Sequence, residues 1–439
     1  MIELDQTRAR FLASVQDLYA KRKVFSGPLT SIRTSYWQKW LQSELPTRKS
    51  EQFRYFPLKD FYLEKFDELG MEIFLHPQMI DEEVLPECQG ASIVMVNGRL
   101  RLDLSNLSAL SKKIVLLPLE KALHSYEIFL TNRYQKLLTK EANPFTLMNF
   151  ALSQEGGFLY IPPGTQCEKP IQILHFISGK EGSVGLIHPK WQIFVGNNSK
   201  ADCIQTCHFI RPQCAVWVNQ DIDITLEEGA NFSLISDATV EDGHYLFSST
   251  RTLQKRDSKF TFIHVTNGSK AIKQDIECSL VGEGASADVN GFWLTFADRH
   301  VHTYCNILHE APNTTSNQLF KGILLDSSVS SFEGKIFVNK IAQKTAAYQL
   351  NKNLLLGENV KAYTKPNLEI FADDVKASHG ATVGYFSDDE LFYLAARGIE
   401  KKSATRLLTT SFVQDILDKI SLQSLQENYK ELLTRTFEV

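Results

Sequence analysis

The spacing of hydrophobic residues changes twice along the chain, from a helical period to an alternating one and back again. Over residues 4 to about 45 the apolar positions follow the helical period, which predicts two helices. Their apolar faces comprise Phe11, Leu12, Val15 and Leu18 in the first helix and Trp37, Trp40 and Leu41 in the second. Residues 93–102 alternate around Asn97-Gly98, a pair that readily forms the positive-φ turn of a β-hairpin. A further helix is expected over residues 119–138, before Asn143-Pro144.

From about residue 158 to residue 371 the pattern becomes a series of short alternating runs rich in Val, Ile, Phe and Thr. Alternation is typical of strands, and helical stretches are nearly absent, which excludes a βαβ fold. Corners of small and polar residues recur roughly 27 to 30 residues apart, at 197–199, 228–230, 256–258 and 283–285. A period of this size fits one coil of a β-solenoid, in which each coil stacks on the last. A two-sheet sandwich or jelly roll would give similar alternation, and the regular corner spacing favours the solenoid.

After Gly384 the helical period returns. The run Ser387-Asp388-Asp389-Glu390 has the capping-box pattern and opens a helix that is expected to end at Arg397-Gly398. Two amphipathic stretches follow, with apolar residues Leu408, Phe412, Val413, Ile416, Leu417 and Ile420 in the first and Leu425, Tyr429, Leu432 and Leu433 in the second. The sequence therefore predicts a mostly helical region with a β-hairpin at 1–150, a β core at 151–384 and a helical domain at 385–439.

Composition places the chain among ordinary folded proteins, because 43% of its residues are hydrophobic and 22% are charged. The formal net charge of −4 gives no electrostatic reason to expect nucleic acid or an anionic membrane as a partner. The acidic N-terminus lacks the pattern of a secretory signal, and the apolar runs are too short to span a bilayer. Seven cysteines without framework spacing suit a reducing compartment. We therefore expect a cytoplasmic protein.

Motifs of the common catalytic and nucleotide-binding classes are absent. The sequence contains no phosphate-binding loop, no G-x-S-x-G and no strand followed by G-x-G-x-x-G. His309-Glu310 begins like a zinc-protease motif, but residue 313 is Asn where the second histidine is required. The chain is thus expected to bind no nucleotide itself, so any coupling to ATP would come from a partner.

Two groups of metal-ligand residue types stand out. Cys203, Cys207 and Cys214 match neither the pairs of structural zinc sites nor the runs that hold iron–sulfur clusters, so buried cysteines acting as small hydrophobes are the favoured reading. His300 and His302 would share one face of a strand and would be able to share an ion, with Cys305 and His309 nearby. Histidines in such positions are more often merely solvated, and both readings stay open.

The segment 368–384 is the most distinctive in the chain. Two acids, Asp373 and Asp374, mark a corner, and Ser378-His379-Gly380-Ala381-Thr382 then leads into small residues where another chain would be able to approach closely. A turn with a hydrogen-bonded histidine would explain the same residues equally well. Chemistry alone leaves a functional His379 and a structural one evenly balanced.

These residues also carry a resemblance to a known family, the SufB/SufD proteins of iron–sulfur cluster assembly. The most specific matches are Lys365-Pro366-Asn367-Leu368-Glu369-Ile370, Ala372-Asp373-Asp374-Val375-Lys376, the Ser378–Thr382 run and Leu391-Phe392-Tyr393-Leu394-Ala395-Ala396-Arg397-Gly398-Ile399. Weaker matches are Ser331-Phe332-Glu333-Gly334-Lys335-Ile336, Pro312-Asn313-Thr314-Thr315-Ser316, Asn143-Pro144-Phe145, Ile161-Pro162-Pro163-Gly164 and the entry motif Pro46–Tyr55, with Phe53 where the family has Trp. The resemblance covers nearly the whole chain.

The resemblance implies a mainly β fold, a right-handed parallel β-helix core flanked by N-terminal and C-terminal helical segments. It further implies a scaffold without enzymatic activity that pairs with a SufB-like subunit through the β-helices, with a homodimer possible in isolation. The C-terminal helices, at roughly 385–421, would dock a SufC-like ABC ATPase. His379 maps onto the family histidine that holds iron or a transient iron–sulfur cluster at the subunit interface, and it is therefore the expected metal and cluster ligand.

Two departures refine this expectation. Some relatives have Cys just before the Ser-His-Gly run, where this chain has Ala377, so a thiolate from that position is lost. SufB-like proteins have a His-Glu-Ala-Thr element where this chain has His379-Gly380-Ala381-Thr382, which favours the SufD branch. Two other readings remain open: a β-helix carbohydrate-active enzyme, for which Asp373-Asp374 offers a close acidic pair, and a structural SufB partner with no ligand role.

Overall fold

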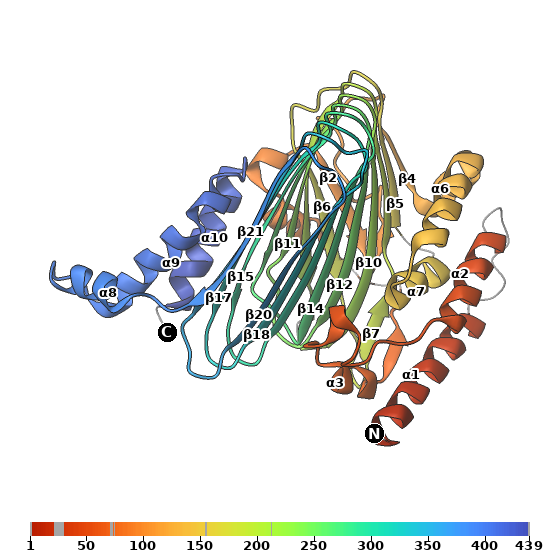
Figure 1. Cartoon of the computed structure of the whole chain (residues 1–439). Coiled ribbons are helices and arrows are strands. Elements are labelled where there is room, and N and C mark those ends of the chain that lie inside the picture. Colours follow the sequence, from red (N-terminus) through yellow and green to blue (C-terminus); the bar gives the residue numbers. More distant parts are fainter. Residues whose placement is uncertain are drawn as a thin grey trace.

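The core of the chain is a parallel β-solenoid of about eight turns, made of two sheets that face each other (Figure 1). The computed structural model describes residues 2–21, 30–70, 73, 75–153, 156–211 and 213–437. Each turn contributes one strand to each sheet, and successive strands of a sheet pair in parallel. The first sheet contains β5 (Gly156–Ile161), β8 (Lys190–Val195), β10 (Val216–Leu226), β12 (Tyr245–Gln254), β14 (Ala271–Leu280), β16 (His300–His309), β18 (Val329–Val338) and β20 (Lys361–Ile370). The second contains β6 (Ile171–Ile177), β9 (Lys200–Phe209), β11 (Asn231–Ala238), β13 (Lys259–Thr266), β15 (Ser286–Thr295), β17 (Thr315–Leu324), β19 (Thr345–Leu355) and β21 (Val375–Gly384).

The corners read from the sequence are the turns between these two sheets. The corner residues Asn198, Gly229, Asp257, Gly284, Asn313 and Lys344 all have positive φ angles, between 53° and 72°. Their backbone amides form a ladder along the molecule, because the N–H of Asn198 donates to the carbonyl of Glu228 at 2.9 Å and that of Gly229 donates to Arg256 at 2.9 Å. Each turn thus copies the corner of the turn before it. The solenoid prediction is confirmed, and the sandwich alternative is wrong.

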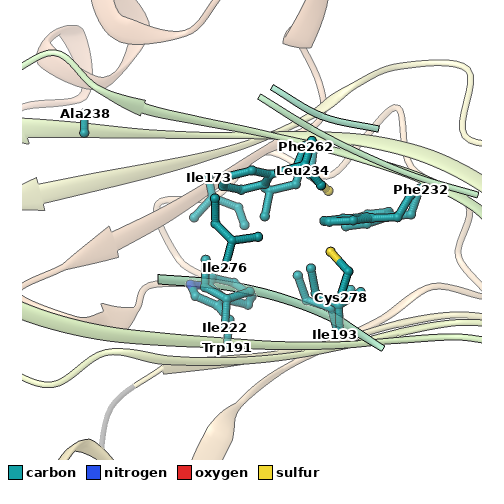
Figure 2. Close-up of a cluster of buried hydrophobic side chains, with 14 of the residues drawn as sticks. Ile173, Trp191, Ile193, Ile222, Phe232, Leu234, Ala238, Phe262, Ile276 and Cys278 are labelled. Carbon is teal, nitrogen blue, oxygen red and sulfur yellow. The ribbon is translucent and has the colours of Figure 1, made fainter. Parts of the chain in front are cut away.

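The interior of the solenoid is packed with apolar side chains over its first turns. Figure 2 shows Trp191, Ile222 and Ile276 of the first sheet facing Ile173 and Phe262 of the second. These residues alternate with outward-facing ones along each strand, which is the pattern that predicted the strands. Burial of these apolar faces is the main force that stacks the turns.

The start of the solenoid is closed by short strands from the N-terminal region. These are β2 (Ser92–Val96), β3 (Arg99–Leu100) and β4 (Val115–Pro118), with β1 (Phe66–Glu68) and β7 (Val184–Ile187) pairing beside them. The expected hairpin is confirmed, since Asn97 and Gly98 have φ angles of 44° and 85° between β2 and β3. However, β2 also pairs in parallel with β6, and β4 pairs antiparallel with β5. The strands of the first 150 residues are therefore continuous with the two sheets, and the boundary at 150 stays a prediction.

The N-terminal helices lie against the outer face of the first sheet (Figure 1). They are α1 (Ile2–Lys21), α2 (Thr30–Gln42), α3 (Leu58–Leu63), α5 (Leu119–Ser125), α6 (Glu127–Lys140) and α7 (Pro144–Leu152), with the short helix η1 (Glu51–Phe53). Two other short helices of this region, α4 (Pro77–Glu83) and η2 (Pro86–Cys88), lie instead against the second sheet, where Ile80 and Cys88 are buried. The two expected first helices are confirmed, but Leu41 points to solvent and is 42% exposed. The single helix expected at 119–138 is wrong: the helix is interrupted at Tyr126, which leaves the helical conformation with φ −125° and ψ 31°.

Ion pairs buried between these helices and the sheet fix their position. Arg133 of α6 donates two hydrogen bonds to the carboxylate of Asp223 on β10, at 2.8 and 2.5 Å. Arg251 of β12 donates to Glu141 at 2.9 Å and also to Asp221. A buried charge is tolerated only when it is paired, so these contacts tie the helical layer to one position on the sheet.

The C-terminal helices lie on the opposite side of the solenoid (Figure 1). They are α8 (Asp388–Ala395), α9 (Lys401–Leu417) and α10 (Gln423–Thr436). The predicted capping box at Ser387 is present, and Gly398, with φ 79°, follows the end of α8 as expected. The apolar faces of α9 and α10 cover the outer face of the second sheet, where Val413, Ile416 and Tyr429 are buried.

Candidate functional site

The C-terminal end of the solenoid is open. The last strands, β20 and β21, have ten residues each, and most of these residues are exposed or only half-buried. Within the described part of the chain no further strand pairs outside either of them. Proteins usually shorten or cover such edges, because an unpaired edge recruits strands from other chains. The mouth, defined here as the space between β20 and β21, is thus the one place where both sheets present a long free edge in the described residues.

His379 lies in this mouth. Val375 pairs in register with buried Thr345 and packs into the interior, so the alternate residues of β21, including His379, also face the interior. The imidazole is nevertheless exposed, because no turn covers β21. The two acids that precede it, Asp373 and Asp374, are exposed in the turn between the last two strands. The structure therefore places the predicted ligand at the free end of the solenoid, between its two sheets.

The interior residues beneath His379 form a column that changes from apolar to polar. Parallel pairing places, in order from the first turn, Ile171, Cys203, Leu234, Phe262, Val289, Gln318, Gln349 and His379 on top of one another. The first five are apolar, as expected for a buried stack. Gln318 and Gln349 are amides although they are only 0% and 3% exposed. Sequence reasoning missed both glutamines, because an isolated Gln carries no signal unless the coils are first aligned.

A brace from the N-terminal region supports β20 from outside. Tyr55 stacks on Tyr363 of β20, with ring centroids 3.6 Å apart and planes 8° from parallel, and Lys365 pairs with Glu51. Between the brace and the sheet lies a cavity of about 340 Å³, lined by His302, Tyr304 and Glu333 among others. Burial raises the pKa of the Glu333 carboxyl, although Lys273 and Lys335 oppose this effect. The entry motif at 46–55 was noticed in the sequence, but its contact with the last turn was not.

The second histidine group does not assemble into a metal site. His300 and His302 share one face of β16, as expected, and this face is the outer one. His302 Nε2 lies 3.4 Å from His300 Nδ1, and His302 Nδ1 lies 2.7 Å from the Ser331 hydroxyl. Cys305 faces the interior, and His309 is buried between the hydroxyls of Thr314 and Ser316, each at 2.8 Å. Across the residues described, no group of three or more His, Cys, Asp or Glu side chains stands close enough to hold a metal ion.

The three neighbouring cysteines are structural, as favoured from the sequence. Cys203 and Cys214 are buried, and Cys203 and Cys207 both contact the apolar interior cluster. Burial raises the pKa of the Cys207 thiol to about 12, and it raises the pKa of the Cys203 thiol well above its ordinary value. Both thiols are therefore protonated near neutral pH and are poor ligands.

The first helix of the tail stands apart from the rest of the molecule (Figure 1). None of the α8 residues is buried; Phe392 is 74% exposed, and Tyr393 is also exposed with the Arg397 guanidinium 4.3 Å above its ring. Residues 385–387 alone separate α8 from β21. By contrast, the later part of α9 is anchored by Lys321 of β17, which donates to the Phe412 carbonyl and, at 2.8 Å, to Asp415. The apolar faces of α10 and of the end of α9 thus cover the core of their own chain, whereas α8 covers none of it.

The fold and its open end define a parallel β-solenoid protein whose last turn presents two free strand edges with a histidine between them. Residues 175–412 match the model for the SufBD core domain of SUF-system FeS cluster assembly, and residues 13–173 match that for the SufBD protein N-terminal region. The chain therefore belongs to the SufBD family of iron–sulfur cluster assembly proteins, and it is SufD-like.

Relatives of this family align over almost the full chain. The iron–sulfur cluster assembly SufBD family protein slr0076 of Synechocystis is 28% identical over 89% of this chain and 87% of its own length. The iron–sulfur cluster assembly protein SufD of Escherichia coli is 27% identical over 89% of each chain. The chloroplastic protein ABCI7 of Arabidopsis thaliana is 25% identical over 94% of this chain and 87% of its own length. In the described residues, no helix has the length and apolarity needed to cross a membrane.

Proposed function

We propose that this chain is a non-enzymatic scaffold subunit that pairs with a SufB-like subunit and contributes His379 as an interface ligand to iron or to a nascent iron–sulfur cluster. The observation that supports this proposal most directly is the position of His379 between the two free strand edges. A ligand at such a place becomes part of a closed site only when a partner covers the mouth. The cluster is then cargo that is built in the seam and released from it.

The edges β20 and β21 support pairing with another solenoid. An added strand on each edge would continue both sheets, satisfy the free backbone groups and bury the interior-facing Ile370 and Val383. Both of these apolar side chains are exposed in the single chain. A second copy of this chain would be able to pair with the same edges, and we infer that the homodimer expected in isolation would form in this way.

The chemistry of His379 supports a single-ligand contribution. A neutral imidazole is a good ligand for iron, and Ala377, two residues earlier, supplies no thiolate. We infer that the remaining ligands, including any thiolate, come from the SufB-like subunit. Such a shared site would bind its cargo only in the assembled complex and would open when the seam moves.

The exposed part of the tail supports docking of a SufC-like ABC ATPase. The exposed aromatic residues Phe392 and Tyr393 of α8 and Leu407 of α9 are side chains that a single chain would normally bury. The later half of α9 is already committed to the second sheet, so the docking surface is narrower than the 385–421 expected from the sequence. ATP would then be bound and hydrolysed by the partner, in the cytoplasm.

The test is co-expression of the chain with SufB-like and SufC-like subunits, followed by measurement of iron and sulfide in the purified complex. We expect His379→Ala to assemble normally and to lose most of the bound iron. The matched control is His124→Ala, an exposed histidine on α5 far from the mouth in sequence and structure. If no complex forms with the unaltered chain, the pairing is wrong; if His379→Ala retains normal iron, the ligand role is wrong.

A further inference from the structure

The amides beneath His379, those of Gln318 and Gln349, share one hydrogen bond, and within the described residues the Gln318 nitrogen and the Gln349 carbonyl have no other partner. Gln349 Nε2 donates to Gln318 Oε1 at 3.0 Å, which points the nitrogen of the Gln349 amide toward the turn below. Gln349 Oε1 is buried and has no hydrogen-bond partner among the described residues. Leaving such an acceptor unpaired in the interior destabilises the folded chain. A buried glutamine at this point calls for a partner that the isolated chain does not provide.

The opposite wall of the solenoid is adapted to the Gln349 side chain. Gly334 of β18 lies across the interior, and a Cβ at that position would stand only 1.4 Å from Gln349 Nε2. Glycine is therefore required there for the amide to extend across the interior. Both walls thus hold the Gln349 amide in one place, one turn below the mouth, and the residue directly above it in register is His379.

We propose that Gln349 is a positioning residue for His379, its side-chain carbonyl accepting the hydrogen of one imidazole nitrogen when a partner closes the mouth. This inference rests on the proposed ligand role of His379. The bond satisfies the orphan carbonyl and fixes the tautomer of the ring, so that the other nitrogen, with its lone pair, faces the seam. Histidines that bind metals are almost always held in this way through their second nitrogen, and removal of that support typically weakens metal binding 10- to 100-fold.

The experiment measures Fe²⁺ affinity of the assembled apo-complex by anaerobic chelator competition, together with X-ray absorption for nitrogen in the iron coordination shell. Gln349→Leu removes the acceptor together with the amide that pairs with Gln318, and we expect about a 10- to 100-fold loss of affinity with weaker nitrogen scattering. Gln349→Glu keeps an acceptor, and we expect it to retain affinity. The matched control is Gln205→Leu, which removes an equally buried amide from the Gln205–Gln220 pair deep in the solenoid. Complex formation and thermal unfolding verify that each variant is folded.

The outcomes separate this inference from the proposed function. If His379→Ala loses iron but Gln349→Leu binds it with unchanged affinity and unchanged nitrogen scattering, Gln349 does not position the ring and the ligand role of His379 stands. If Gln349→Glu is as weak as Gln349→Leu while both fold, the carbonyl is not acting as an acceptor and the inference is overturned. If His379→Ala binds iron normally, the proposed function fails first, and this inference fails with it.

Discussion

The ion pair between Asp223 of β10 and Arg133 of α6 joins the first sheet to the N-terminal helices. Burial opposes ionisation of Asp223, yet the paired Arg133 guanidinium outweighs burial and lowers the pKa to about 2. The pKa in the folded state is thus below the ordinary value of 3.8. The pair therefore stabilises the fold fully above about pH 4 and loses this contribution as the pH falls toward 2.

Replacing Arg133 by Met leaves that carboxylate buried without its ion-pair partner, with the Gln192 amide as a remaining hydrogen-bond donor. We expect the free energy of unfolding at pH 7 to fall by about 3–5 kcal/mol, as measured by chemical denaturation. The free energy of unfolding should also fall less steeply below pH 4, because the ion pair that acid disrupts is already absent from this variant. Arg435→Met is the control, because the Arg435–Glu431 pair is exposed and should contribute less than about 1 kcal/mol. Equal effects of the two substitutions would contradict the structural role given to Arg133.

At the same scale, the sequence identified His379 but not its surroundings. The Ser-His-Gly-Ala-Thr run singles out the residue, whereas the face it occupies depends on strand register, and a slip of one residue would turn the side chain outward. Gln318, Gln349 and His379 are separated by 31 and 30 residues, close to the spacing of the corners. Aligning the chain coil by coil would therefore have brought the three together. The contact of Tyr55 with Tyr363 has no such signal in the sequence. Tyr55 lies in the N-terminal helical region, outside the repeating coils, so aligning the coils does not bring it next to Tyr363.

At the scale of elements, α8 is the helix whose exposure is not explained by the isolated chain. Replacing both Phe392 and Tyr393 by Ser should weaken binding of a SufC-like ATPase about ten-fold or more, because aromatic anchors dominate such interfaces. Stability of the chain should change by about 0.5 kcal/mol or less, since neither side chain is buried. Calorimetry or surface plasmon resonance measures the first quantity and thermal unfolding the second.

The matched control for α8 is Ile128→Ser on α6, an equally exposed apolar residue (79%) on the opposite side of the molecule. It should leave ATPase binding unchanged. An unaltered dissociation constant for the α8 variant would show that the partner docks elsewhere.

Helices of this chain were predicted with uneven success, for physical reasons. The capping box at Ser387 is a local signal, and α8 begins where it indicates. The break at Tyr126 between α5 and α6 has no proline or glycine to announce it, so it escaped prediction. Leu41 follows the helical period of its neighbours and is still exposed, although Trp40 before it and Leu45 after it are buried.

At the scale of the whole molecule, the two ends of the solenoid are unlike. Repeat proteins need closing elements with a polar outer face at both ends, and here β2, β3 and β4 close only the first. The corner spacing in the sequence predicts the stack of turns, but it is the same at both ends and does not show which one is left open. Only the pairing of the short N-terminal strands with β5 and β6 reveals this difference.

An open end predicts that the apolar interior of the last turn is completed by another chain. Val383 faces the mouth and is 44% exposed, so Val383→Asp should leave the isolated chain folded. Once a partner closes the mouth, the same aspartate would be buried without a counter-ion, at a cost of several kcal/mol. We therefore expect at least a hundred-fold weaker binding of the SufB-like subunit, measured by calorimetry, and loss of any homodimer in light scattering. The control is Val281→Asp, at an exposed corner residue (38%) remote from the mouth, and it should change neither binding of the SufB-like subunit nor the homodimer. If pairing survives Val383→Asp, the interface lies away from β20 and β21.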